Sequence, residues 1–154
     1  ICEYIGNILK QQNHEIKINP ISLEPEKLGE YDSIILGASI RYGKHQKSVF
    51  NFINKHKDLL ETKNNAFFSV NVVARKSEKN SPYTNPYMKK FLKISKWQPN
   101  KLGVFAGKVD YPSYKFFDKY IIRMIMWITK GPTDISQSYE FTDWKVVENF
   151  AKTL

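Results

Sequence analysis

The sequence predicts an α/β protein with a parallel β-sheet and helices on both of its faces. Three mostly apolar runs, 33–39, 65–73 and 101–109, lack the alternation of half-exposed strands, and this is typical of strands that are covered on both sides. Amphipathic helical segments separate these runs, and such alternation favours parallel strands joined by right-handed crossovers. The length of 154 residues suits a single domain, residues 1–154.

Amphipathic helices are predicted over residues 1–13, about 46–60, 87–97 and 142–154. The first segment reads as a helix already under way, so we expect chain to precede it. Thr142 is the expected N-cap of the last helix, whose first turn carries Asp143. The side chains expected to face inward on the two middle helices are Val49, Phe52, Ile53, His56 and Leu60, and Met88, Phe91, Leu92 and Ile94.

A half-exposed strand is predicted near the start of the chain, before the first buried run. In residues 14–19, Ile16 and Ile18 alternate with polar residues, and Pro20 ends the segment. Residues 21–32 are expected to form a loop that leads into the first buried strand.

Composition limits the partners that this protein can have. The hydrophobic fraction of 42% and the aromatic fraction of 14% are those of a globular protein. Cys2 is the single cysteine, which excludes an intrachain disulfide and fits a reducing compartment, and no signal peptide is visible. The net charge of +9 indicates an acidic partner, either nucleic acid, anionic lipid or an anionic small molecule.

A long apolar segment, residues 110–141, interrupts the alternation of strands and helices before the last helix. It is too long for a simple connection and is expected to contain a helix from about Ser113 to Lys130, ended by Gly131. Lys115, Lys119 and Arg123 recur every four residues on this helix, and most of its other side chains are apolar. Such a helix suits a membrane interface or an apolar ligand cleft, unless its apolar face packs on the domain itself.

Three loops should meet at the carboxyl end of the sheet, where open parallel sheets bind ligands. They are residues 37–44, 69–76 and 106–114, and each begins with small or polar residues and continues into an aromatic residue, a cation or both. Each feature alone is compatible with an ordinary turn or a solvated surface. Because all three occur at one edge, they favour a site for a planar ligand.

Other chemistries lack their sequence signatures. The histidines His14, His45 and His56 have no metal-ligand spacing, so no metal site is expected. Neither a G-x-S-x-G nucleophile elbow, a P-loop nor a G-x-G-x-x-G motif is present, which argues against hydrolytic and dinucleotide chemistry.

With these motifs in hand, the chain resembles a known family. The segments ILGASIRYGKH, FFSVNVVARKSEK, KKFLKISKWQP, YPSYKFFDKYIIRMIMWITKGPTD and YEFTDWKVVENFA look like the flavodoxin-like, menaquinone-dependent protoporphyrinogen oxidases of bacterial haem biosynthesis. The resemblance implies a flavodoxin-like three-layer fold of strand order 2-1-3-4-5 and bound FMN. It further implies oxidation of protoporphyrinogen IX, with electrons passed to menaquinone or ubiquinone.

The resemblance also implies where the ligands lie. Residues expected to bind the cofactor are Ser39, Ile40, Arg41, Tyr42, Gly43, Phe68, Ser69, Val70, Asn71, Val72, Ala74, Arg75, Gly107 and Tyr111. Lys115, Lys119, Arg123 and Trp127 on the inserted helix are expected to face the substrate or the membrane. No catalytic base is identified; Tyr42 and His45 are candidates by position only.

The family's first strand and its hydroxyl-rich phosphate loop lie before the helix with which this chain begins. We therefore expect an N-terminally truncated domain that binds FMN poorly until these elements are restored, because the phosphate would lack its charge-assisted bonds.

The resemblance implies a cytoplasmic protein associated peripherally with the inner face of the cell membrane, and the sequence allows a homo-oligomer. Alternatives are a flavodoxin-type quinone reductase with another electron donor, an electron carrier, and a nucleic-acid binder. The high positive charge argues against a carrier, since ordinary carriers of this fold tend to be acidic. The aromatic residues of the basic stretch 75–101 are better explained as helix core, so no nucleic-acid partner is expected.

Overall fold

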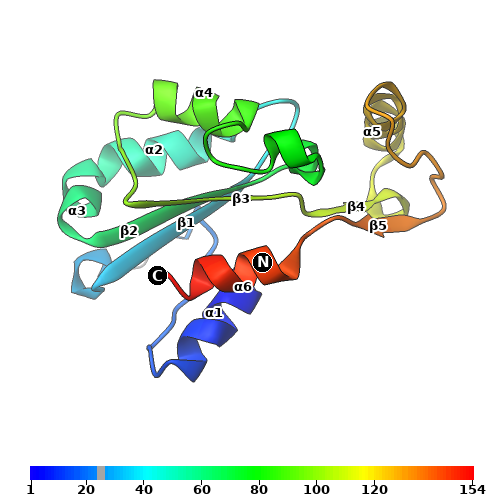
Figure 1. Ribbon diagram of the computed structural model, residues 1–154. Helices are drawn as coiled ribbons and strands as arrows, with labels where there is room; N and C mark the ends of the chain where they lie inside the picture. The colour runs from blue at the N-terminus through cyan, green and yellow to red at the C-terminus, as the bar shows by residue number, and fades with distance from the viewer. Residues whose placement is uncertain (24–26) are drawn as a thin grey trace.

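The computed structural model describes residues 1–23 and 27–154 (Figure 1). Its central sheet contains three parallel strands in the order β1-β2-β3, namely β1 (Ser33–Ser39), β2 (Asn64–Val70) and β3 (Lys101–Phe105). The middle strand β2 is buried from Asn65 to Ser69, as its unalternating apolar sequence predicts. The three expected parallel strands are therefore confirmed, and β2 and β3 are largely buried. The expectation that β1 is covered on both faces is wrong, since Ile34, Leu36 and Ala38 are buried but the alternate residues Gly37 and Ser39 are exposed.

Helices cover both faces of this sheet (Figure 1). One face carries α2 (Lys47–Lys55), α3 (Lys57–Thr62) and α4 (Pro86–Ile94), and the other carries α1 (Cys2–Gln11) and α6 (Trp144–Ala151). Consecutive side chains of β2 point to opposite helical layers, as strand geometry requires. Phe67 stacks on Phe91 of α4 with 3.8 Å between ring centroids, whereas the ring of Phe68 lies 6.2 Å from that of Phe150 of α6. The predicted three-layer α/β fold is thereby confirmed.

The helix predicted over residues 46–60 is divided in two at His56. His56 has a φ of −114°. It is the C-cap of α2 and also the N-cap of α3. Its ring lies 4.8 Å from the ring of Phe52, between centroids. Leu60, on the second piece, is completely buried in the same core cluster as Val49 and Phe52, so the break keeps both pieces against the sheet.

Two details of the later helices differ from the prediction. Ile94 is 54% exposed rather than inward, because α4 ends there and Trp97, three residues further on, is completely buried in its place. The N-cap of α6 is Asp143 and not Thr142, since the Asp143 carboxylate accepts hydrogen bonds from the backbone N–H groups of Lys145 and Val146.

The prediction of a strand over residues 14–19 is wrong, because this segment has no regular secondary structure. A groove of about 230 Å³ separates it from β1, so no ladder of hydrogen bonds joins the two. Ile16 and Ile18 instead pack on α1, where a Cβ added to Gly6 would lie 2.9 Å from the Ile18 Cδ1. The loop predicted over 21–32 contains a short 3₁₀ helix, η1 (Leu28–Glu30), and its residues 24–26 lie outside the described part.

The strand predicted over residues 101–109 is also divided. Gly107 has a φ of +76°, a left-handed conformation that bends the chain after β3. Beyond this bend, β4 (Lys108–Asp110) pairs antiparallel with β5 (Ser138–Glu140), and Val109 lies opposite Tyr139. The left-handed glycine thus directs the chain out of the main sheet and into the insertion.

The insertion forms a small lobe beside the three layers, at the far right of Figure 1. Its helix α5 (Phe116–Ile128) follows the 3₁₀ helix η4 (Tyr111–Ser113). The lobe has its own small core of Val109, Tyr111 and Met126, separate from the core under α2 and α4. In the described residues, no helix has both the length and the apolar character needed to cross a bilayer.

Candidate functional site

The carboxyl ends of the three parallel strands lie side by side. Ser39 of β1 is the partner of Val70 of β2, and Val70 is the partner of Phe105 of β3. The backbone N–H of Ile40 continues this pairing by donating to the carbonyl oxygen of Val70 at 2.9 Å. The three loops predicted to form a ligand site therefore start at one edge, as the parallel topology requires.

The loop after β1 closes on itself in a tight turn. Arg41 and Lys44 exchange two backbone hydrogen bonds of 3.0 and 3.2 Å, and the residues between them, Tyr42 and Gly43, both have positive φ values of 50° and 73°. Two consecutive left-handed residues are the signature of a type I′ turn, in which glycine is favoured. The turn projects the exposed Tyr42 side chain toward the insertion, where its hydroxyl donates to the Asp118 carboxylate at 2.6 Å.

A cavity of about 360 Å³ lies at this edge, on the side of α1 and α6. Ser39, Phe68, Val70 and Gly107, which belong to the predicted cofactor site, contribute to its wall. The remaining lining residues come from the end of β1, the first residues of α1 and the segments flanking the insertion: Gly37, Ala38, Ile1, Cys2, Lys108, Glu140, Thr142 and Trp144.

The lining of this cavity fits the ring of a flavin. Ser39 and Gly107 are small, so a flat ligand can approach the strand ends closely, whereas the ring of Phe68 already packs on Gly37. Phe68 and Trp144 supply aromatic surface, and the polar rim contains Lys108 and Glu140. An aromatic and apolar wall with a few polar groups is typical of sites for planar cofactors.

The other predicted cofactor residues divide into two groups by accessibility. Arg41, Tyr42 and Gly43 are exposed, and Ile40 and Val72 are half-buried, so their side chains can reach a ligand. Ser69, Asn71 and Ala74 are buried on the α2–α4 side of the sheet, where their side chains contact other protein groups. These three side chains therefore support the loop after β2 from inside the protein.

Arg75, predicted as a flavin contact, is hydrogen-bonded to the insertion. Its Nη2 donates to the carbonyl oxygen and the hydroxyl of Thr129 at 2.8 and 2.9 Å, and its Nη1 donates to the Val72 carbonyl at 3.2 Å. Its guanidinium also lies 5.9 Å from the ring centroid of Phe141. Arg75 thus ties the C-terminal end of α5 to the loop after β2.

Tyr111, predicted at the ring edge, is completely buried in the lobe instead. Its hydroxyl donates to the Pro132 carbonyl at 2.9 Å, and its ring meets those of Tyr114 and Tyr139. Burial raises the pKa of this phenol, so it stays protonated as a donor. The structure gives its side chain a packing role, which the sequence could not distinguish from an exposed one.

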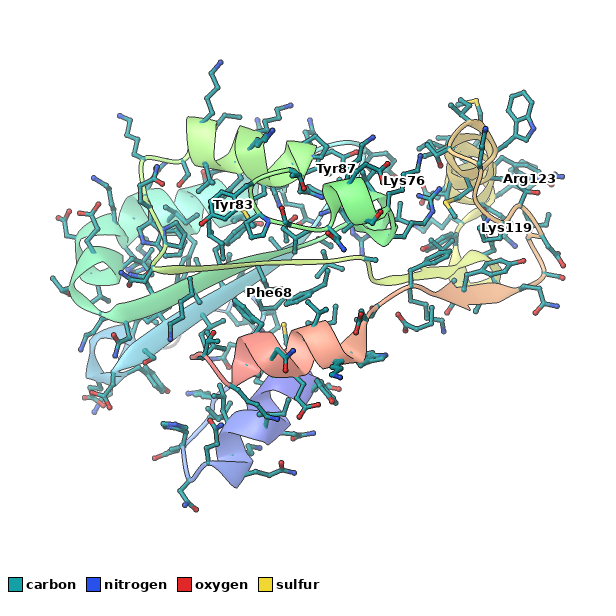
Figure 2. All side chains as sticks on the ribbon, in the orientation of Figure 1. Phe68, Lys76, Tyr83, Tyr87, Lys119 and Arg123 are labelled. Atoms are coloured by element: carbon teal, nitrogen blue, oxygen red, sulfur yellow. The ribbon has the colours of Figure 1, made fainter. Side chains whose placement is uncertain are left out.

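The apolar surface of α5 faces solvent. Met126 is completely buried, but Phe117 is 79% exposed and Trp127 is 73% exposed. Figure 2 shows Lys119 and Arg123 on the same helix, beyond the end of the sheet. The exposed apolar residues are Phe116, Phe117, Tyr120, Ile121, Met124, Ile125, Trp127 and Ile128. Exposed apolar residues in such a number on one helix are typical of an interaction surface.

Sequence reasoning missed five residues of the cavity wall: Ile1, Cys2, Glu140, Thr142 and Trp144. Lys108 lies in the predicted loop 106–114 but is not among the expected cofactor residues. Glu140, Thr142 and Trp144 come from the end of the insertion and the residues after it, more than thirty positions along the chain from Gly107, and the pairing of β4 with β5 returns them to the sheet edge.

Comparison with known proteins agrees with this arrangement. The sequence matches the family described as Flavodoxin domain over residues 1–136. The parallel sheet, its two helical layers and the cavity at its carboxyl edge thus belong to a flavodoxin-domain protein. No solved structure matches the chain significantly.

Curated relatives define the family more narrowly. Protoporphyrinogen IX dehydrogenase [quinone] of Escherichia coli K12 is 39% identical over 155 aligned residues, which cover the whole chain and 86% of that protein. A Leishmania major protein with the same name is 46% identical over 124 residues, 80% of this chain and 54% of that protein. The chain belongs to the protoporphyrinogen IX dehydrogenase (quinone) family within the flavodoxin-domain proteins, as its resemblance indicated.

Proposed function

We propose that this protein oxidises protoporphyrinogen IX to protoporphyrin IX, with FMN as its cofactor and a respiratory quinone, menaquinone or ubiquinone, as electron acceptor. The single observation that carries the proposal is the 39% identity over the whole chain with a protein named for this reaction. The reaction places the protein in haem biosynthesis. Conversion of one macrocycle removes six electrons and six protons, so three quinones are reduced to three quinols.

The residues at the carboxyl edge of the sheet would hold the flavin ring. Ser39, Val70 and Gly107 line the cavity, and the turn containing Tyr42 and Gly43 follows β1 at the same edge of the sheet. FMN, when bound, supplies two-electron transfer chemistry. The protein's part is to orient the ring and the macrocycle and to exclude water, and no side chain is assigned as proton acceptor.

The macrocycle would approach from the side of the inserted helix. Lys115, Lys119 and Arg123 are cations that can pair with the carboxylates of the substrate's propionate groups. The exposed aromatic and aliphatic residues of α5 offer apolar surface to its flat body. These two features of one helix match a ligand that is flat and apolar but carries carboxylates.

An assay separates this function from its nearest rivals. The FMN-loaded protein is mixed with protoporphyrinogen IX and a quinone in the absence of oxygen, and porphyrin fluorescence is followed. We expect fluorescence to increase only when the quinone is supplied. NAD(P)H consumption without porphyrinogen would instead support a flavodoxin-type quinone reductase, and reversible flavin reduction without either reaction would support an electron carrier.

We further propose that the protein is cytoplasmic and binds peripherally to the inner face of the cell membrane. The exposed Phe117 and Trp127 would enter the headgroup region, while Lys115, Lys119 and Arg123 would attract anionic lipids. Contact with the bilayer would also give the site access to a lipid-soluble quinone. The chain could act as a monomer or homo-oligomer in this arrangement.

We propose finally that an additional extended strand fills the groove beside β1 and that its hydroxyl-rich loop holds the FMN phosphate. The groove runs between α1, residues 15–21 and β1, and in the described residues no strand pairs with that side of β1. FMN affinity should therefore be low for residues 1–154 and should rise when the chain is extended upstream by such a strand and loop. Equal affinity of both forms would contradict this part of the proposal.

A further inference from the structure

Four buried polar side chains form a hydrogen-bonded row beneath the carboxyl end of β2. They are His45, which precedes α2, Ser69 of β2, Asn71, which follows β2, and Asn85, the N-cap of α4. All four are at most 6% exposed. His45 Nε2 lies 3.0 Å from Ser69 Oγ, Asn71 Nδ2 lies 3.2 Å from the same oxygen, and Asn85 Nδ2 lies 3.0 Å from Asn71 Oδ1. The row thus joins the loop after β1 to both ends of the connection between β2 and α4.

The cap of α4 fixes the direction of the hydrogen bonds from Asn85 to Ser69. Asn85 Oδ1 accepts from the backbone N–H groups of Tyr87 and Met88, so Asn85 Nδ2 must be the atom that donates to Asn71 Oδ1. The Asn71 Nδ2 then donates to Ser69 Oγ. Because Ser69 is completely buried, its own hydroxyl hydrogen needs an acceptor, and His45 Nε2 is within reach.

Acceptance of that hydrogen requires a neutral His45 with its own hydrogen on Nδ1. A hydrogen on Nε2 would take this acceptor away from the buried Ser69 hydroxyl, and burial of a donor without an acceptor is unfavourable. The surroundings favour the neutral ring as well, since it lies edge-on to Phe67 and Phe91 at 5.5 and 5.6 Å between centroids. Burial among these rings lowers the pKa of His45 to about 4.

The same row determines where the loop after β2 begins. The Asn71 N–H donates to the Phe105 carbonyl at 2.9 Å. The Asn71 carbonyl accepts from the N–H of Ala74, and this hydrogen bond forms the first turn of the 3₁₀ helix η2 (Val72–Arg75). At the end of η2, Arg75 holds Thr129 of the insertion. A displacement of the Asn71 side chain would therefore move the loop after β2, which follows the cavity-lining Val70, together with the attachment of α5.

We propose that His45 is a positioning residue of this site: its unprotonated Nε2 accepts the Ser69 hydroxyl, and the row through Asn71 to Asn85 orders residues 71–75 against the edge of the sheet. The inference rests on the proposed function for its flavin readout. Its tautomer and loop-order readouts do not require FMN.

The first test is made on the full chain without flavin. Nitrogen-15 NMR of the His45 ring at pH 7 should show hydrogen on Nδ1 and a free lone pair on Nε2. In His45→Phe, which retains an aromatic ring but offers no acceptor, amide hydrogen exchange at Ala74 and Lys76 should accelerate about tenfold or more. His45→Gln, whose side-chain oxygen can accept from Ser69, should restore slow exchange.

Asn65→Ala provides a matched control. Asn65 is equally buried, at 6% exposure, and lies at the opposite end of β2, where its side chain bonds to the carbonyls of Leu60 and Lys63 and to the Asn100 N–H. This variant should lower the thermal midpoint without accelerating exchange at Ala74.

The second test measures FMN binding by quenching of flavin fluorescence and by visible circular dichroism, with the upstream extension present. We expect affinity to fall about tenfold in His45→Phe, to recover in His45→Gln and to remain unchanged in Asn65→Ala. The inference is overturned if Nε2 carries the hydrogen, if exchange at Ala74 is the same in His45→Phe, or if Asn65→Ala has the same effects. If the parent protein binds no FMN, the proposed function fails, and the NMR and exchange results still decide the tautomer and the ordering of the loop.

Discussion

The hydroxyl of Tyr42 donates a 2.6 Å hydrogen bond to the carboxylate of Asp118, joining the turn after β1 to the first turn of the inserted helix. The two residues are 76 positions apart in the sequence. Together with Arg75, which holds the other end of α5 through Thr129, this bond places the insertion across two of the three loops of the proposed site. The position of α5 is thus coupled to the edge that should hold the flavin.

The hydrogen bond between Tyr42 and Asp118 should change the pKa of the Tyr42 phenol. The hydrogen bond to Asp118, and then the negative charge of that carboxylate, raise the pKa of Tyr42. Asp118→Asn should therefore lower the Tyr42 pKa toward its ordinary value. The measurement is the difference in tyrosinate absorbance between each protein and its Tyr42→Phe counterpart during an alkaline titration. An unchanged difference curve would show that the bond does not form in solution.

Lysine should not be able to replace Arg75 in holding the C-terminal end of α5. Lysine keeps the positive charge but lacks the planar group that donates at once to Thr129 and Val72. We expect Arg75→Lys to reduce the free energy of unfolding by about 1–3 kcal/mol, measured by urea denaturation. Arg41→Lys, a change at an exposed arginine, is the control and should stay within about 0.5 kcal/mol. Equal losses in both variants would refute this role of Arg75.

His45 should make the protein sensitive to acid. Its pKa is lowered to about 4 in the folded state, so the unfolded chain binds more protons between that value and the ordinary 6.5. Stability is therefore complete above about pH 6.5 and decreases as the pH falls toward 4, by about 3 kcal/mol at most. His45→Gln should lose this part of the pH dependence in denaturation curves, while the contribution of the carboxyl groups remains. A parallel pH profile in both proteins would contradict the prediction.

Two glycines near the site should respond differently to alanine. A Cβ added to Gly37 would lie 2.2 Å from Cζ of Phe68, a ring that is 2% exposed and packed against Phe105 and Phe150. We expect Gly37→Ala to destabilise the fold by about 1–3 kcal/mol through overpacking. A Cβ at Gly43 would meet nothing within 4 Å, so Gly43→Ala should cost only the backbone strain of its left-handed conformation, about 1 kcal/mol. Thermal denaturation of the two variants checks the order.

The exposed face of α5 should bind anionic membranes. In sedimentation with vesicles that contain phosphatidylglycerol, Phe117→Ala/Trp127→Ala should bind about tenfold more weakly than the parent. Lys119→Glu/Arg123→Glu should bind weakly and lose most of the salt dependence. Tyr83→Ala, at an aromatic residue that is 80% exposed on another part of the surface, is the control. Equal binding by all of these proteins would exclude α5 as the membrane contact.

Local sequence patterns sufficed for the elements that form a continuous apolar run or a clear helical period. The strands around Ile35, Phe67 and Val104 and the helices that begin at Cys2 and Lys47 were predictable because an apolar run or a helical period records contact with a continuous core. The patterns failed at residues 14–19 and at His56. Alternation at Ile16 and Ile18 occurs in any extended segment that buries one of its two faces. Such a segment becomes a strand only where a neighbouring strand pairs with its backbone by hydrogen bonds.

The sequence by itself determined the layered α/β fold, the insertion and the edge at which three loops meet, since these follow from periodicity and from the direction of parallel strands. Only the tertiary structure decided what individual polar groups do. Arg75 is hydrogen-bonded to the insertion, Tyr111 is hydrogen-bonded within it, and His45 pairs with Ser69, and each of these residues finds its partner 21 to 54 positions away in the chain. Partners so distant leave no local pattern, since their meeting depends on the packing of whole helices and strands against one another.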